Sequence, residues 1–462
     1  MSTLLLPPTL LYRIHSSSPR LVLPSSSTPS DTDNTARPHL VLDLVLATEH
    51  GLRRRSDFER DGWQQIPVRA EWVSRYKPKG DPVEAGSATL VGGKGQIVVR
   101  LPERKSNRAD GYRAAGWTIL VRANGILPIL TLALGPFDDL DEQLRTETLR
   151  PDGSEVDVDV TTWRPFEVTG GVTVYSKEEW GGGIPSKVWD SALVIARFLC
   201  IRFPQSPSLA SVSWPALEHY LGALLRTTSS TKLAKVLDLS TGTGFLGMVV
   251  GAATTTWVRE SSRAVDGAPT SIAEVNIALT DLESALGFIR DNLSANEPFL
   301  APHDPLAGEP QMCRVSFQVS PLSWDDKDAS DALGTFDLVL ATDLAYEAEQ
   351  IENLAGCLER CVKPRAWAIL AYKRRALTED EERTFWAALR RNFDVSVVMG
   401  GVVDSKGAAV DFRDIMGIAS GRNTEPRAAW LFEREGWDTG EAEKLDQWSK
   451  GLGIIVCQLQ RK

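Results

Sequence analysis

Three aspartates stand at the carboxyl ends of short apolar segments in the second half of the chain. Asp238 lies near the end of the first segment, Asp281 closes the second, and Asp343 follows residues 336–342. Because the carboxyl ends of neighbouring parallel strands meet at one edge of a sheet, we expect these carboxylates to face a shared ligand. A carboxylate attracts a cation and accepts hydrogen bonds from the paired hydroxyls of a ribose. The spacing therefore favours a ligand that carries a ribose and a positive charge.

A glycine turn follows Asp238 closely. Residues 242–247 read G-T-G-F-L-G and match the G-x-G-x-x-G pattern, in which Gly242 and Gly244 let the backbone approach a ligand. This match requires a dinucleotide oxidoreductase to be considered, but the carboxylate of Asp238 would repel a pyrophosphate. The same carboxylate would attract the sulfonium and the amino group of S-adenosylmethionine. The turn therefore favours this cofactor over a dinucleotide.

Four stretches of the chain resemble motifs of one known family. They are V-W-D-S-A at residues 188–192, D-L-S-T-G-T-G-F-L-G at 238–247, L-S-W at 322–324 and F-D-L-V-L-A-T-D-L-A-Y at 336–346. Together they resemble the seven-stranded (class I) S-adenosylmethionine-dependent methyltransferases, and among these methyltransferase family 16 of non-histone protein-lysine methyltransferases, of the methyltransferase-like 21 type. The resemblance extends over roughly residues 164–400 and the final strand. Ser240 departs from the family's pattern, which commonly has a glycine at this place.

The resemblance implies a site for S-adenosylmethionine and a pair of catalytic residues. Asp343 and Tyr346 match the family's D-x-x-Y positions, so we expect Asp343 to orient the amine that accepts the methyl group and Tyr346 to wall the channel. The residues expected to bind the cofactor are Trp189, Asp238, Gly242, Thr243, Gly244, Asp281, Trp324 and Thr342. No residue is expected to bind a metal.

The acidic and aromatic site residues each have a purely structural interpretation as well. Asp343 suits the N-cap of the helix that holds Ile351, and Asp281 suits the N-cap of the helix after the second strand, in which case Glu283 is the other candidate for the ribose. The two tryptophans suit packed positions beside their loops. The sequence alone leaves these alternatives open.

The order of apolar segments predicts an α/β fold. We expect a Rossmann-like seven-stranded methyltransferase sheet whose last strand is antiparallel, preceded by a β-rich N-terminal accessory region. Residues 252–271 are polar and predict a long loop after the helix of the glycine turn. The strands expected beyond those already named are 315–319, 366–372, 393–398 and 454–459.

Composition divides the chain into three parts. Residues 1–38 are rich in Ser, Pro and Thr and predict a disordered tail, because such a segment buries little apolar surface. Residues 39–163 contain short alternating segments separated by glycine, proline and charged clusters, which predict the β-rich accessory region. Residues 164–462 form the methyltransferase domain, with an insertion at about 400–450.

Charge and cysteine content limit the partners and the compartment. The formal net charge of −10 argues against non-specific binding to nucleic acid, and no apolar run reaches the length that a membrane span needs. The five cysteines are scattered and show no zinc-binding spacing, which favours a reducing compartment. We therefore expect a cytoplasmic protein. Arg13 and Arg20 in a tail without early acids give only a weak resemblance to a transit peptide.

Three classes of function follow from these observations. The first is a protein-lysine N-methyltransferase that acts on a non-histone protein such as a translation factor, a ribosomal protein or a chaperone, as the resemblance implies. The second is a methyltransferase for a small nitrogen nucleophile such as nicotinamide. The third is a non-catalytic methyltransferase fold used as a binding module.

Overall fold

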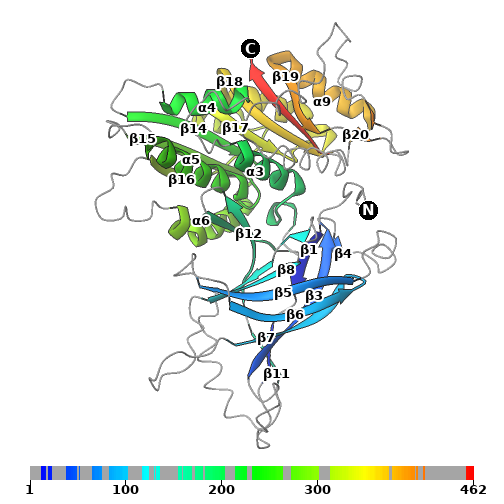
Figure 1. Cartoon of the computed structure of the whole chain (residues 1–462). Coiled ribbons are helices and arrows are strands. Elements are labelled where there is room, and N and C mark those ends of the chain that lie inside the picture. The colour runs from blue at the N-terminus through cyan, green and yellow to red at the C-terminus, as the bar shows by residue number, and fades with distance from the viewer. Residues whose placement is uncertain are drawn as a thin grey trace, which may run out of the picture. The chain divides into compact units, whose positions relative to one another are not determined.

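The computed structural model describes helices and strands in both halves of the chain (Figure 1). The ranges described are 12–16, 19–22, 38–48, 51–52, 65–74, 83–101, 117–123, 129–130, 132–135, 155–158, 160–168, 172–179, 183–202, 214–225, 231–263, 272–300, 313–373, 377–400, 402–403, 409–410 and 454–462. Two compact units divide these ranges, one of Leu10–Pro165 and one that contains Phe166–Lys462. The sequence-based interpretation places the same division after residue 163.

The first unit is built mainly from antiparallel strands around an apolar core. Its core side chains alternate along the strands, as in β3, where Leu40, Leu42, Leu44 and Leu46 are all buried. The strands are β1 (Tyr12–Ser16), β2 (Arg20–Val22), β3 (His39–Thr48), β4 (Gly51–Leu52), β5 (Gln65–Ser74), β6 (Val83–Val91), β7 (Lys94–Arg100), β8 (Trp117–Ala123), β9 (Ile129–Leu130), β10 (Leu132–Leu134), β11 (Glu155–Asp157) and β12 (Thr162–Val168). The path β11-β2-β3-β7-β6-β5-β8-β10-β12 orders most of them.

The prediction of a disordered tail over residues 1–38 was wrong for two segments. Strands β1 and β2 both pair with β3, and they bury Ile14 and Leu21 in the core. The pairing of β1 and β2 depends on partners far along the chain, so local composition does not reveal it.

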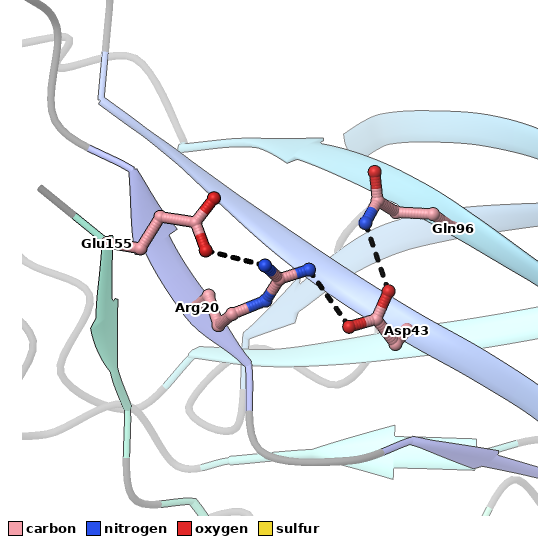
Figure 2. Close-up of polar contacts among 4 residues, drawn as sticks. All are labelled: Arg20, Asp43, Gln96 and Glu155. Carbon is pink, nitrogen blue, oxygen red and sulfur yellow. Dashed lines mark hydrogen bonds and ion pairs between the residues drawn. The ribbon is translucent and has the colours of Figure 1, made fainter. Parts of the chain in front are cut away.

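A surface network joins strands β2, β3, β7 and β11 (Figure 2). Arg20 donates to Glu155 at 2.5 Å and to Asp43 at 2.9 Å, and Gln96 donates to the other oxygen of Asp43 at 3.0 Å. The two ion pairs are partly exposed, so water screens them and each stabilises the unit only slightly. Their effect is to keep the short strands β2 and β11 in register with the longer β3.

The second unit contains the seven-stranded sheet. Its strands are β14 (Thr231–Leu239), β15 (Ile272–Asp281), β16 (Cys313–Pro321), β17 (Phe336–Thr342), β18 (Val362–Lys373), β19 (Phe393–Gly400) and β22 (Ile454–Arg461). They lie in the order β16-β15-β14-β17-β18-β22-β19. The strands β14 to β18 pair in parallel, and β22 runs antiparallel to both β18 and β19. This arrangement confirms the predicted sheet with its antiparallel last strand.

Helices cover both faces of this sheet. The helices α3 (Asp190–Arg202), α4 (Pro215–Leu225), α5 (Phe245–Arg263) and α6 (Leu286–Leu300) pack on one face, and α7 (Lys327–Leu333), α8 (Ile351–Cys361) and α9 (Glu379–Asn392) on the other. Alternate residues of β14 face the two helix layers. Leu237 and Leu239 pack in the core with α8 and α9, whereas Asp238 lies against α5 on the other face. Since both faces are covered, the carboxyl edge of the parallel strands is the place for a ligand.

Residues 252–263 belong to α5, so the loop predicted from 252 was wrong over this range; Ala252, Ala253 and Trp257 are buried at helical spacing. Helix α9 begins with a capping box, since Thr378 and Glu381 each accept a hydrogen bond from the other's backbone N–H.

The predicted insertion at 400–450 lies mostly outside the described residues, apart from the short strands β20 (Val402–Val403) and β21 (Ala409–Val410). Among the helices that the structure describes, none combines the length and the apolar character needed to cross a bilayer.

Candidate active site

The glycine turn joins β14 to α5 in a conformation that suits glycine. Gly242 has φ 59° and Gly244 has φ 78°, both in the left-handed region. A Cβ at Gly242 would lie 3.2 Å from the carbonyl oxygen of Pro185, and one at Gly244 would lie 3.3 Å from the side chain of Ile289. The turn therefore packs closely on its neighbours at both glycines, where a side chain would not fit without a shift. Thr243 between the glycines is buried.

Asp238 lies under this turn. Its Oδ2 accepts hydrogen bonds from the hydroxyl of Thr241 and from the N–H of Gly247, the latter at 2.8 Å. Burial raises the pKa of Asp238 to about 7, against the opposing effect of these two donors. The carboxyl group thus fixes the shape of the turn, and it contributes negative charge to the site only when it is ionised.

Asp281 binds the glycine turn from the next strand. Its Oδ2 accepts from the N–H of Gly242 and its Oδ1 from the N–H of Leu282, both at 2.8 Å. Burial raises its pKa as well. The 3-10 turn that precedes α6 has Leu282 at its N-cap with no side-chain cap bond, so Asp281 does not cap this element. The first two predicted carboxylates therefore meet at one turn.

Trp324 extends toward the glycine turn from the loop after β16. Its Nε1–H donates to Ser240 Oγ at 2.8 Å, and its ring meets Tyr346 edge to face at 6.3 Å between centroids. Its carbonyl accepts from Arg360 at 3.2 Å. The pKa of Tyr346 is raised by burial and by the charges of Glu347 and Asp281, so its phenol stays protonated. This aromatic pair therefore lies close to Asp281.

Asp343 follows the end of β17 in a left-handed conformation with φ 58°. Its N–H donates to Ala371 of β18 at 2.9 Å, and its Oδ2 accepts from the N–H of Ser191 at 3.2 Å. Helix α8 begins with Gln350 as its N-cap, so Asp343 is not the cap of the helix that holds Ile351. The carboxylate instead binds the first turn of α3. A strained backbone conformation at a residue whose side chain makes such a specific contact is typical of functional sites.

A buried ion pair lies next to Asp343. Lys373, the last residue of β18, donates to Asp190 Oδ2 at 2.8 Å, and both side chains are at least nine-tenths buried. Asp190 precedes Ser191, and Lys373 is two residues beyond Ala371. The ion pair therefore joins the two segments that hold Asp343.

Trp189 lies at the start of α3 on a loop that contacts the glycine turn. Its carbonyl accepts the first helical N–H groups of α3, and its Nε1–H donates to Ile184 at 2.9 Å. Pro185, on the same loop, provides the carbonyl that faces Gly242. The indole is only partly buried, so it is not a core residue. It borders the same edge of the sheet.

The predicted residues thus gather along the carboxyl ends of β14, β15 and β17. Leu239 pairs with Ala341, so Thr342 and Asp343 continue beside the start of the glycine turn. A cavity of about 480 Å³ lies elsewhere, over β14, β15 and β16 beside α7, and none of the predicted site residues lines it. The structure therefore brings the ten residues to one edge, where their predicted contacts with a cofactor stay predictions.

Sequence reasoning missed three contributors to this edge. Leu282 is 57% exposed beside Asp281 and offers an apolar surface there. Lys373 could have been noticed as a cation directly after the predicted strand 366–372. The role of Ser240 as acceptor for Trp324 gave no local signal, because the two residues are 84 positions apart.

The residues present fit S-adenosylmethionine. The two closely packed glycines form a cradle that a Cβ would fill, and ionisable carboxyl groups lie beneath it and beside it. A ligand with a ribose and a cationic centre matches this set of donors and acceptors. The cradle would hold the cofactor, with Asp281 at the ribose and Trp324 at the adenine.

Comparison with known proteins defines the class. A family model described as lysine methyltransferase matches residues 171–392. Protein-lysine N-methyltransferase EFM6 of Saccharomyces cerevisiae is 28% identical over 218 residues, which cover 46% of this chain and 72% of that protein. Protein N-lysine methyltransferase METTL21A of Danio rerio is 26% identical over 216 residues, covering 47% and 72%. EEF1A lysine methyltransferase 3 of Mus musculus is 28% identical over 155 residues, covering 34% and 51%.

The chain is therefore a methyltransferase that uses S-adenosylmethionine as its methyl donor. Residues 171–392, which match the lysine methyltransferase family model, include all ten predicted site residues.

Proposed function

We propose that the protein is an S-adenosylmethionine-dependent protein-lysine N-methyltransferase that acts in the cytoplasm on a non-histone protein such as a translation factor, a ribosomal protein or a chaperone. The names of the relatives given above support a protein substrate, and one of them names EEF1A. The observation that carries the proposal is the placement of Asp343. It lies beside the glycine turn, with its carboxylate oriented by α3.

When bound, S-adenosylmethionine supplies a methyl group on a sulfonium, which an uncharged amine accepts by in-line displacement. Asp343 holds the incoming lysine ammonium by charge. Once the ammonium has released its proton to the carboxylate or to solvent, Asp343 accepts a hydrogen bond from the amine, which aims its lone pair at the methyl group. The Ser191 N–H fixes one carboxylate oxygen during both steps. Because this anchor and the Ala371 carbonyl restrain Asp343 from two sides, little reorganisation is needed when the amine arrives.

Tyr346 forms an apolar wall beside this position. Its ring is half-buried against Trp324, and its raised pKa keeps the phenol uncharged at neutral pH. A dry wall lowers the pKa of the substrate ammonium and thereby favours the neutral amine that reacts. The side chain thus supports the deprotonation that the reaction requires without itself taking the proton.

Labelled cofactor tests the substrate class. The purified chain is incubated with tritiated S-adenosylmethionine and either a cell lysate or a panel of small amines that includes nicotinamide. We expect label in a discrete protein band and at lysine after hydrolysis. Label only in a small amine would support the alternative substrate class, and cofactor binding without any transfer would support a binding module. The matched control is Asp343→Asn, which keeps the side-chain shape and an acceptor oxygen for Ser191.

The cytoplasmic location is a separate part of the proposal. It is supported by the scattered cysteines, all of which are buried and unpaired by disulfides. A fluorescent fusion of the full chain should fill the cytoplasm, and a fusion of residues 1–40 that entered mitochondria would contradict this location.

A further inference from the structure

Ser240 adopts a conformation that glycine would adopt more easily. Its φ is 51°, in the left-handed region, and it directly follows β14 at the start of the glycine turn. A Cβ crowds the backbone in this region, so a serine there is strained relative to glycine. Gly242 and Gly244 meet the same demand in the same turn without this strain. Backbone geometry therefore does not explain why a serine stands at this position.

The reason lies in its hydroxyl, which accepts the indole N–H of Trp324 at 2.8 Å. Trp324 belongs to the loop after β16, and β15 separates β16 from β14 in the sheet. The indole therefore spans the carboxyl tip of β15, where Asp281 binds the glycine turn. The hydrogen bond fastens the far end of the ring to β14.

Other contacts hold Trp324 less specifically. Arg360 binds its carbonyl, which restrains the backbone of the loop and leaves the ring free to turn. Tyr346 meets the ring edge to face at 6.3 Å, a contact that tolerates several ring orientations. Among the contacts that the described residues make with Trp324, the bond to Ser240 is the directional one that involves the indole itself.

We propose that Ser240 is a positioning residue for cofactor affinity: its hydroxyl fixes the Trp324 ring as the floor on which the adenine of S-adenosylmethionine lies. The inference rests on the proposed function, because it concerns binding of that cofactor. Ser240 acts through Trp324 and does not touch the reacting atoms. A glycine at position 240 would relieve the backbone strain at φ 51°, but it would also remove the hydroxyl that holds the Trp324 ring.

The test measures the dissociation constant of S-adenosylhomocysteine by isothermal titration calorimetry, with the melting temperature of each variant. The variants are Ser240→Gly, Trp324→Phe and the double variant. Trp324→Phe keeps an aromatic floor but removes the N–H donor. Arg365→Gly is the matched control, since Arg365 is exposed and has φ 65° on β18, so this change relieves left-handed strain without touching the indole.

We expect Ser240→Gly to weaken binding about fivefold, as the loss of one hydrogen bond predicts. Its melting temperature should be unchanged or higher, because glycine suits the turn. In the Trp324→Phe background the same change should have no further effect, since the bond is already absent. The loss should be equal for S-adenosylmethionine, because the two ligands share the adenine. Arg365→Gly should leave both affinities unchanged.

Two results would overturn the inference while leaving the methyltransferase assignment intact. One is a Ser240→Gly variant that binds as tightly as the unaltered protein. The other is a loss of equal size in both backgrounds, which would mean that Ser240 shapes only the turn. Failure of the unaltered protein to bind either ligand would instead contradict the proposed function itself.

Discussion

The pKa of Asp238 predicts an unusual dependence of cofactor binding on pH. Burial raises this pKa from the ordinary value of 3.8 to about 7, so the carboxyl group is largely protonated in slightly acidic solution. The ionised form attracts the cationic centres of S-adenosylmethionine, whereas the protonated form does not. Affinity should therefore rise as the pH increases through neutrality.

The magnitude follows from the ionised fraction. With a pKa of about 7, Asp238 is roughly one-tenth ionised at about pH 6 and nine-tenths ionised at about pH 8, so affinity should rise about tenfold across this interval. The stability of the free protein should change in the opposite direction. Because the folded-state pKa lies above the unfolded one, the contribution of Asp238 is complete below pH 3.8 and is lost as the pH rises through about 7.

Calorimetric titrations with S-adenosylmethionine at several pH values measure this effect. Binding below pH 7 should also release protons, which titrations in buffers of different ionisation enthalpy reveal. Asp238→Asn is the matched control and should flatten both profiles, since the amide keeps an acceptor for Gly247 but does not titrate. A pH dependence that survives in this variant would refute the reasoning and assign the titration to another group.

Three other perturbations test the remaining parts of the site. Asp343→Asn should lower methyl incorporation at least about 100-fold, because the carboxylate charge is lost. It should change cofactor affinity less than twofold, because asparagine tolerates φ 58° and its amide oxygen still accepts from the Ser191 N–H. Activity within tenfold of the unaltered protein would contradict this role of Asp343. Lys373→Met should destabilise the chain by about 3–5 kcal/mol in urea unfolding because it removes the ammonium group from the buried Asp190 carboxylate. Adding Asp190→Asn should recover most of this loss, and a stable single variant would show that the ion pair contributes little. Gly242→Ala should lower the melting temperature and weaken cofactor binding more than tenfold. The new Cβ would lie 3.2 Å from the carbonyl oxygen of Pro185, and residue 242 has a φ of 59°, which alanine adopts only with strain. An unchanged affinity in calorimetry would show that Gly242 does not contribute to the cofactor site.

Features that depend on neighbouring residues could be predicted from the sequence. The strand, glycine turn and helix around Asp238 form one continuous segment, and the capping box of Thr378 and Glu381 spans four residues. Parallel strands that share an edge then place Asp281 and Asp343 beside the turn, as topology requires. The sheet and its site edge were predictable for this physical reason.

Features that depend on distant partners could not be predicted. The hydrogen bond from the Ser191 N–H to Asp343 joins residues 152 positions apart, so the sequence gives no sign of it. From the sequence, Asp343 suited the N-cap of the helix that follows it. In the structure its carboxylate instead binds the first turn of α3. Strand β1 pairs with β3, although the sequence between these two strands is polar and rich in proline. Helix α5 extends to Arg263 because packing buries Trp257, which local polarity had obscured.

The central claim is that the carboxyl ends of β14, β15 and β17, with the loop after β16, form one cofactor site. Hydrogen–deuterium exchange of the full chain with and without S-adenosylmethionine tests it most directly. The account predicts protection in peptides that contain residues 238–247, 281–283, 322–326 and 342–346. Protection confined to the residues around the 480 Å³ cavity beside α7, or no protection at saturating cofactor, would contradict it.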